Sequence, residues 1–147
     1  MNKIIGFLKV IILSLFLTSP FFADAQVTRT IASTRGNSVE FIQIYEFNSV
    51  DEQPMFPGGN MALMHFINNE RQYPKEAYQN GIQGRVVCGF VVNEDGRISD
   101  ISVMKSVEQT LDLEAMRIIS VMPPWIAGMI DHHPVPVFCV LAIPFRR

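Results

Sequence analysis

The sequence lacks the residue groupings on which most catalytic and metal sites are built. It has two cysteines, three histidines and no G-x-S-x-G or H-E-x-x-H motif in 147 residues. Acid–base catalysis needs titratable groups within reach of one another. His65 stands alone on an expected helix, and His132 and His133 are neighbours in an expected loop without a third ligand. The sequence therefore predicts no enzyme, no metal site and no cofactor.

Charge of one sign is also missing. Twelve Lys+Arg residues stand against fourteen Asp+Glu residues, for a formal net charge of −2, and the two signs are interspersed. A partner such as nucleic acid or an anionic membrane surface would call for a basic patch or run. The charge pattern argues against both.

Long apolar runs are confined to the start of the chain. Residues 1–9 carry Lys3 and Lys9, residues 10–17 are apolar except for Ser14, and Ala23-Asp24-Ala25 offers small residues at a cleavage spacing. This pattern predicts a signal peptide over residues 1–25. The alternative is that residues 4–22 stay as a membrane anchor, since a span needs about 20 mostly apolar residues. Either way the rest of the chain is expected outside the cytoplasm.

The two cysteines, Cys88 and Cys139, lie on separate expected strands. An oxidising compartment permits a disulfide between them. The alternative is that both are small buried apolar side chains.

Residues 26–49 are expected to form a leader. Residues 26–38 are polar and aperiodic, and residues 39–47 predict a short strand. From Asn60, a candidate N-cap, apolar side chains at helical spacing predict a helix to about Asn69. Pro74 fits the first turn of a second, short helix that Gly81 ends.

Two strands, a helix and a final strand follow. Residues 86–92 alternate cleanly, residues 93–96 (NEDG) predict a turn, and the strand after it slips once around Asp100, which suggests a bulge. Apolar spacing predicts a helix over residues 111–122, ended by Pro123-Pro124. Residues 135–145 alternate without a break.

This order predicts an α+β domain over residues 50–147. An all-antiparallel, three-stranded sheet requires the spatial order 2-1-3, with the helices packed on one face. The final strand is then an edge strand, and three prolines in or near it suit an exposed edge: Pro134, Pro136 and Pro144.

The ordered set of motifs resembles the C-terminal domain of TonB, in the form common in Bacteroidetes-type bacteria. The motifs are FPGG, then YP..A...GI.G.V...F.V..DG.I....V, then LD.EA.R....MP.W..G, then PV.V.....IPF, from about residue 50 to residue 147. The resemblance implies a periplasmic domain that binds the TonB box, a short N-terminal segment of an outer-membrane receptor, as an added strand on the sheet edge. It carries Tyr73 and Pro74 over as matches to the family's Tyr-Pro pair at the helix start, and Trp125 as a match to the Trp after the second helix. The alternatives are packing for Tyr73, helix initiation for Pro74, and a core or hinge role rather than a partner contact for Trp125. The expected partner-binding residues are Tyr73, Pro74, Val135, Val137, Phe138, Cys139, Val140, Leu141 and Ile143.

Two departures from the family pattern put energy coupling itself in doubt, while they leave the binding module intact. Residues 1–25 contain no His, and no long Pro-rich or Lys/Glu-rich spacer follows them. The favoured hypothesis is a periplasmic binding module that supports TonB-dependent transport. The alternative is an inner-membrane-anchored energy transducer that couples the proton gradient, through a proton-channel complex, to outer-membrane receptors. Because an open edge also pairs with its own copy, a homodimer is a further expectation.

Overall fold

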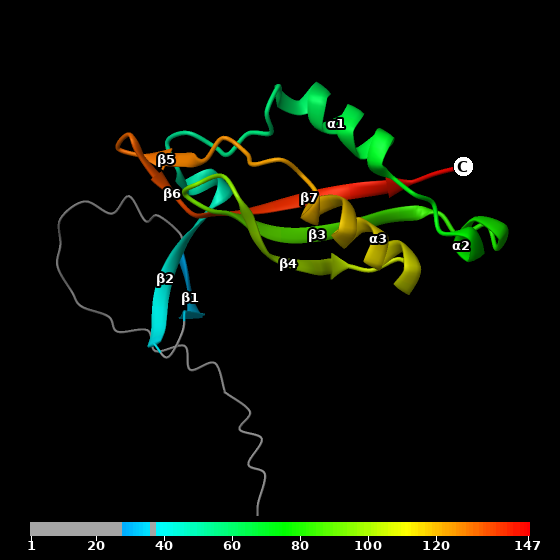
Figure 1. Ribbon diagram of the computed structural model, residues 1–147, viewed down its shortest axis with the longest axis horizontal. Helices are drawn as coiled ribbons and strands as arrows, with labels where there is room; N and C mark the ends of the chain where they lie inside the picture. Colours follow the sequence, from blue (N-terminus) through cyan, green and yellow to red (C-terminus); the bar gives the residue numbers. More distant parts are fainter. Residues whose placement is uncertain (1–27, 36–37) are drawn as a thin grey trace, which may run out of the picture.

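The computed structural model describes residues 28–35 and 38–147 (Figure 1). The expected signal peptide or anchor lies outside these residues. Within the described part of the chain, no helix is both long and apolar enough to cross a bilayer. The elements are β1 (Thr28–Arg35), β2 (Ser38–Glu46), a 3-10 turn η1 (Phe47–Ser49), α1 (Gly59–Glu70), α2 (Lys75–Gln79), β3 (Gly84–Val92), β4 (Ile98–Lys105), α3 (Gln109–Ser120), β5 (Gly128–Ile130), β6 (His133–Val135) and β7 (Val137–Phe145).

The main sheet has five strands in the order β1-β2-β7-β3-β4, so the expectation of a three-stranded sheet is wrong. Its β4-β3-β7 part does have the expected order 2-1-3, with both pairings antiparallel. Because β2 joins β7 in parallel, the whole sheet is mixed rather than all-antiparallel. β1 lies in residues expected to be a polar leader, and it pairs with β2 as a hairpin.

One face of the sheet carries the core. Alternate side chains of β3 and β7 are buried in a single cluster with side chains of α1 and α3, as α+β packing requires. The helices therefore cover the same face. The largest contributors are Phe90, Phe145, Ile67, Leu111, Ile118, Ile119 and Ile143.

The local signals in the hairpin region correspond to specific backbone features. Gly81 and Gly96 have positive φ, at the end of α2 and in the β3–β4 turn. Asp100 has a φ of 52°, and the β3–β4 register shifts between Gly89 and Val91, which confirms the expected bulge. The start of α1 differs from the expectation, because Gly58 rather than Asn60 is its N-cap.

A second, small sheet interrupts the long final alternation. β5 and β6 form a hairpin whose turn residues, Asp131 and His132, both have positive φ. Residues Glu52 and Met55 bridge to this hairpin region from the segment before α1. Val135 therefore belongs to β6, and the last strand begins only at Val137.

Candidate functional site

The outer edge of β7, the side turned away from β3, is the candidate site. The N–H of Tyr45 in β2 donates to the carbonyl of Pro136 at 3.0 Å, which fixes the direction in which Pro136 points. Backbone groups alternate in direction along a strand. The N–H and C=O of Val140 and Ala142 therefore point outward, whereas those of the odd-numbered residues point toward β3.

Within residues 28–35 and 38–147, only the start of this edge is paired. Tyr45 lies opposite Val137 and Glu46 opposite Phe138, and the chain then turns away through η1. The stretch from Val140 onward has no strand beside it among these residues. The edge strand expected from the sequence is thus open over only part of its length.

The far end of the edge is closed by an arginine. Pro144 has no N–H, and its carbonyl accepts a hydrogen bond from Nη1 of Arg71 at 2.6 Å. Arg71 is the C-cap residue of α1, and in Figure 1 the end of α1 approaches the end of β7. Backbone groups that are available to a partner are therefore those of Val140 and Ala142.

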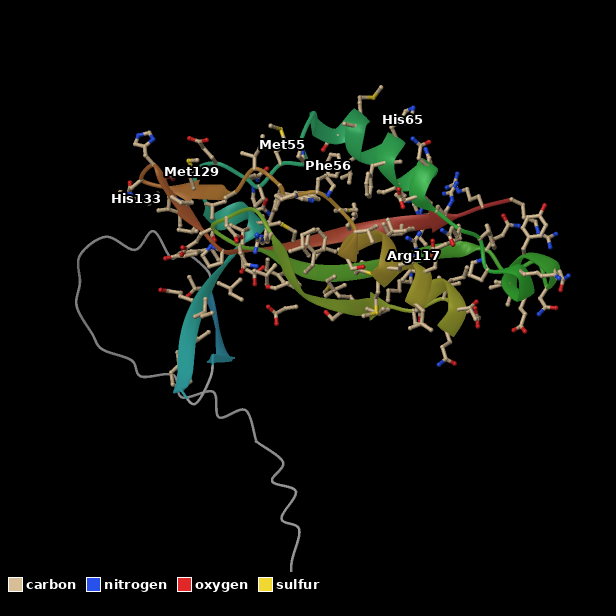
Figure 2. The ribbon with its side chains drawn as sticks, viewed as in Figure 1. Met55, Phe56, His65, Arg117, Met129 and His133 are labelled. Carbon is tan, nitrogen blue, oxygen red and sulfur yellow. The ribbon has the colours of Figure 1, made fainter. Side chains whose placement is uncertain are left out.

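A buried ion pair holds the segment that carries Arg71. Glu114 of α3 is only 8% exposed. Its carboxylate accepts from the N–H of Gln72 at 2.7 Å and from Arg117 at 2.8 and 2.9 Å. Arg117, labelled in Figure 2, also donates to the carbonyl of Glu70 at 2.6 Å. These bonds tie α3 to residues 70–72.

The expected partner-binding residues of the last strand divide into two groups. Val137, Cys139 and Ile143 are buried, with side chains in the core. Their backbone groups face β3, and those of Leu141 do so as well. Phe138 and Val140 point to the opposite face of the sheet, where Val140 is 54% exposed.

Tyr73 connects the α2 region to the end of β7. The Tyr73 hydroxyl donates to the carbonyl of Ile82 at 2.5 Å, and its ring packs edge-on against Tyr78 and Phe145. Pro74 is the N-cap residue of α2. Neither residue lies on the open part of the β7 edge.

Cys88 and Cys139 are free, buried thiols. Cys88 lies opposite Leu141 and Cys139 opposite Phe90, so the cysteines are diagonal neighbours. Diagonal neighbours are about 7–8 Å apart, which is wider than the roughly 4.4–6.8 Å between the Cα atoms of a disulfide. Burial raises the pKa of Cys139 to about 12; burial, and then the charge of Asp112, raise the pKa of Cys88 to about 11.

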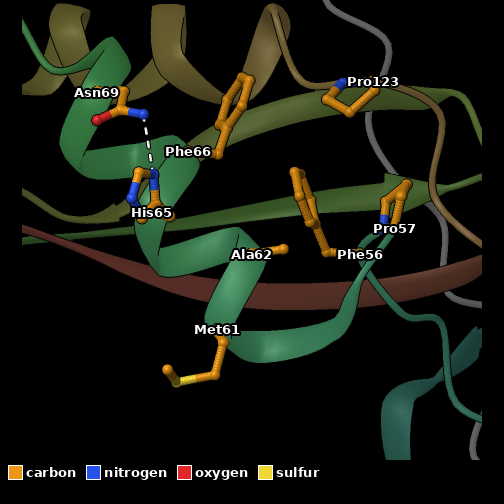
Figure 3. Close-up of a pocket in the computed structure, with 8 residues that line it drawn as sticks. All are labelled: Phe56, Pro57, Met61, Ala62, His65, Phe66, Asn69 and Pro123. Carbon is orange, nitrogen blue, oxygen red and sulfur yellow. Dashed lines mark hydrogen bonds between the residues drawn. The ribbon is translucent and has the colours of Figure 1, made fainter.

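A shallow apolar groove lies between α1 and the chain that follows α3 (Figure 3). His65 and Asn69 are hydrogen-bonded to each other at 2.9 Å on its rim. The described residues include no group of three or more His, Cys, Asp or Glu side chains that could hold a metal ion. The groove is lined by Phe56, Pro57, Met61, Ala62, His65, Phe66, Asn69 and Pro123.

Comparison with known proteins identifies the domain. Residues 69–146 match the family described as the C-terminal of the Gram-negative bacterial TonB protein. The chain belongs to the TonB C-terminal family. Two curated relatives named Protein TonB, from Helicobacter pylori strains J99 and 26695, are each 41% identical to it over 46 residues. That stretch is 31% of this chain and only 16% of each relative.

Two NMR solution structures of the Helicobacter pylori TonB C-terminal domain are also similar to this member of the TonB family. Each is 26% identical in sequence to it. One is matched over 58% of this chain and 90% of that structure, with a TM-score of 0.46. The other is matched over 59% and 80%, with a TM-score of 0.42.

Sequence reasoning missed Arg71, Ala142 and Tyr45. Ala142 could have been found, because it shares its backbone direction with Pro144, which cannot donate to a neighbouring strand. Arg71 and Tyr45 gave no local signal, since each acts through a contact far along the chain.

Proposed function

We propose that this domain is a periplasmic binding module that recognises an extended peptide by strand addition. The peptide is a TonB-box-like segment of an outer-membrane receptor, and the role is to support TonB-dependent transport. Membership of the TonB C-terminal family supports this role. The observation that carries the proposal is the outward-facing backbone of Val140 and Ala142, which has no strand beside it in residues 28–35 and 38–147.

In strand addition, the affinity for the peptide comes from main-chain hydrogen bonds and needs no catalytic group or cofactor. A partner strand satisfies the outward N–H and C=O groups of the edge by main-chain hydrogen bonds, and its alternate side chains give selectivity. On one face of the sheet, the side chains of the added strand meet Phe138 and Val140. Each main-chain hydrogen bond to the edge contributes roughly 0.5–1.5 kcal/mol. We infer that the protein acts as a binding partner rather than as an enzyme.

Titration of the ¹⁵N-labelled chain with N-terminal peptides of outer-membrane receptors tests the proposal. The amide signals of Val140 and Ala142 are expected to shift most. Ala142→Pro removes an outward N–H that the sheet does not use, so it should weaken binding at least about fivefold while the domain stays folded. Ala142→Ser, which keeps the N–H, is the matched control. Unperturbed amides from 135 to 145 in a folded, peptide-saturated sample would refute edge addition.

The favoured location is the periplasm, with residues 1–25 removed. The alternative role, an anchored energy transducer working with an inner-membrane proton-channel complex, predicts that the same residues are retained. Fractionation with N-terminal sequencing separates the two: a soluble mature form that starts at Gln26 excludes the anchored transducer. The oligomeric state of that form tests the proposed homodimer.

A further inference from the structure

The open edge of β7 has a closed boundary at each end. At its start, β2 already pairs with Val137 and Phe138, and Tyr45 donates to Pro136. At its end, Pro144 offers no N–H and its carbonyl is occupied by Arg71. Neither boundary is part of the hairpin scaffold formed by β3 and β4.

The two boundaries are built from segments outside the final strand. β2 comes from the N-terminal hairpin, which pairs with β7 over only its last residues. Arg71 is held by the C-terminal end of α1, and the adjacent Gln72 N–H is fixed by the buried carboxylate of Glu114. Because these contacts are separate, each boundary can be removed alone.

We propose that the β2 end and Arg71 set the length of peptide that the domain accepts. This inference rests on the proposed function. A strand that uses the N–H and C=O of both Val140 and Ala142 lies opposite residues 139–143, and is therefore about five residues long in either direction. Longer peptides find no further main-chain partners. The partner residues that bond to this edge cannot be prolines where they must donate an N–H.

The N-terminal hairpin thereby competes with the peptide for one edge. The Tyr45 N–H occupies the outward carbonyl of Pro136 with a main-chain bond, as an incoming strand would occupy the outward groups of Val140. Detaching the end of β2, where Tyr45 and Glu46 lie opposite Val137 and Phe138, should lengthen the accessible edge at that end. Detaching Arg71 should free the carbonyl of Pro144 at the other end.

The test is the dependence of affinity on peptide length. Receptor N-terminal peptides of five, seven and nine residues, with acetylated and amidated ends and nested from each side, are titrated into the full chain. With the native protein, the dissociation constant should stop improving beyond about five residues. Tyr45→Pro removes the N–H that bonds to Pro136 and should detach the two-residue β2–β7 ladder. Peptides extended toward Val137 should then bind about fivefold tighter for each hydrogen bond gained. Tyr45→Ala loses the same ring but keeps the N–H, and should retain the native limit.

Arg71→Met provides the second variant, in case Tyr45→Pro does not fold. It should improve the binding of peptides extended toward Phe145 about fivefold, because the Pro144 carbonyl becomes available. Arg97→Met, at an exposed position in the β3–β4 turn, is its control. Equal length dependence in the native chain and the folded variants would overturn the length limit alone. Failure of every peptide to bind would overturn the proposed function and this inference together.

Discussion

Replacing Arg117 with methionine would leave the Glu114 carboxylate buried without its cation. In the structure, Nε and Nη2 of Arg117 donate to that carboxylate at 2.8 and 2.9 Å. The remaining partner is the N–H of Gln72. Methionine keeps most of the apolar stem, so the change isolates the loss of the guanidinium.

The magnitude follows from the burial of the two partners. Removing one member of a buried pair costs about 3–5 kcal/mol because the other charge stays uncompensated. Glu114 is 9% exposed at its side chain, but Arg117 is 34% exposed, so water partly replaces the lost cation. We therefore expect Arg117→Met to lower the free energy of unfolding by about 2–3 kcal/mol.

Urea unfolding at pH 7, with the midpoint and slope compared between variants, measures this effect. Arg97→Met is the matched control, since Arg97 and Asp95 are 79% and 59% exposed, and surface pairs contribute about 0–1 kcal/mol. The double variant Glu114→Leu/Arg117→Met should recover much of the loss, because it removes the unpaired charge. If Arg117→Met costs no more than Arg97→Met, the reasoning from buried charge is wrong.

Three further predictions concern thiols, glycines and a turn. Burial raises the pKa of Cys88 to about 11 and of Cys139 to about 12, so both thiols of the folded protein should resist iodoacetamide at pH 8, and rapid labelling of the native state would contradict this. Because unfolded thiols ionise near pH 9, the free energy of unfolding should fall as the pH rises from about 9 toward 11. Gly96→Ala places a Cβ 2.0 Å from the carbonyl oxygen of Trp125 and should lower the free energy of unfolding in urea by more than about 3 kcal/mol. Gly59→Ala, also at positive φ but in open space, should lower it by only about 1–2 kcal/mol, and equal losses would refute the steric argument. His132 has a φ of 63°, so His132→Gly should raise the free energy of unfolding by about 1 kcal/mol and the melting temperature with it. A lower melting temperature would show that the turn is not strained.

The strands with strict alternation could be predicted from sequence because their pattern is local. Residues of β3 and β7 alternate between the core and the opposite face. The directions of the three strands, with a helix between the second and the third, left only one all-antiparallel order for them. The bulge at Asp100 was also visible, since the alternation slips there. These features depend on neighbours within a few residues.

The pairing of β2 with β7 could not be predicted in the same way. β1 is polar, yet it pairs with β2, because main-chain bonds do not require apolar side chains. The break at Pro136 separates Val135 from β7, although the apolar alternation runs through it. Which part of an edge stays open depends on contacts between distant segments, such as Tyr45 with Pro136 and Arg71 with Pro144.

Amide hydrogen exchange at Val140 and Ala142, measured with and without a receptor N-terminal peptide, tests the central claim most directly. The account predicts fast exchange of both amides in the free chain and strong protection of both when the peptide is bound. Saturating peptide that leaves both exchange rates unchanged, or amides that are already protected in the free chain, would contradict it.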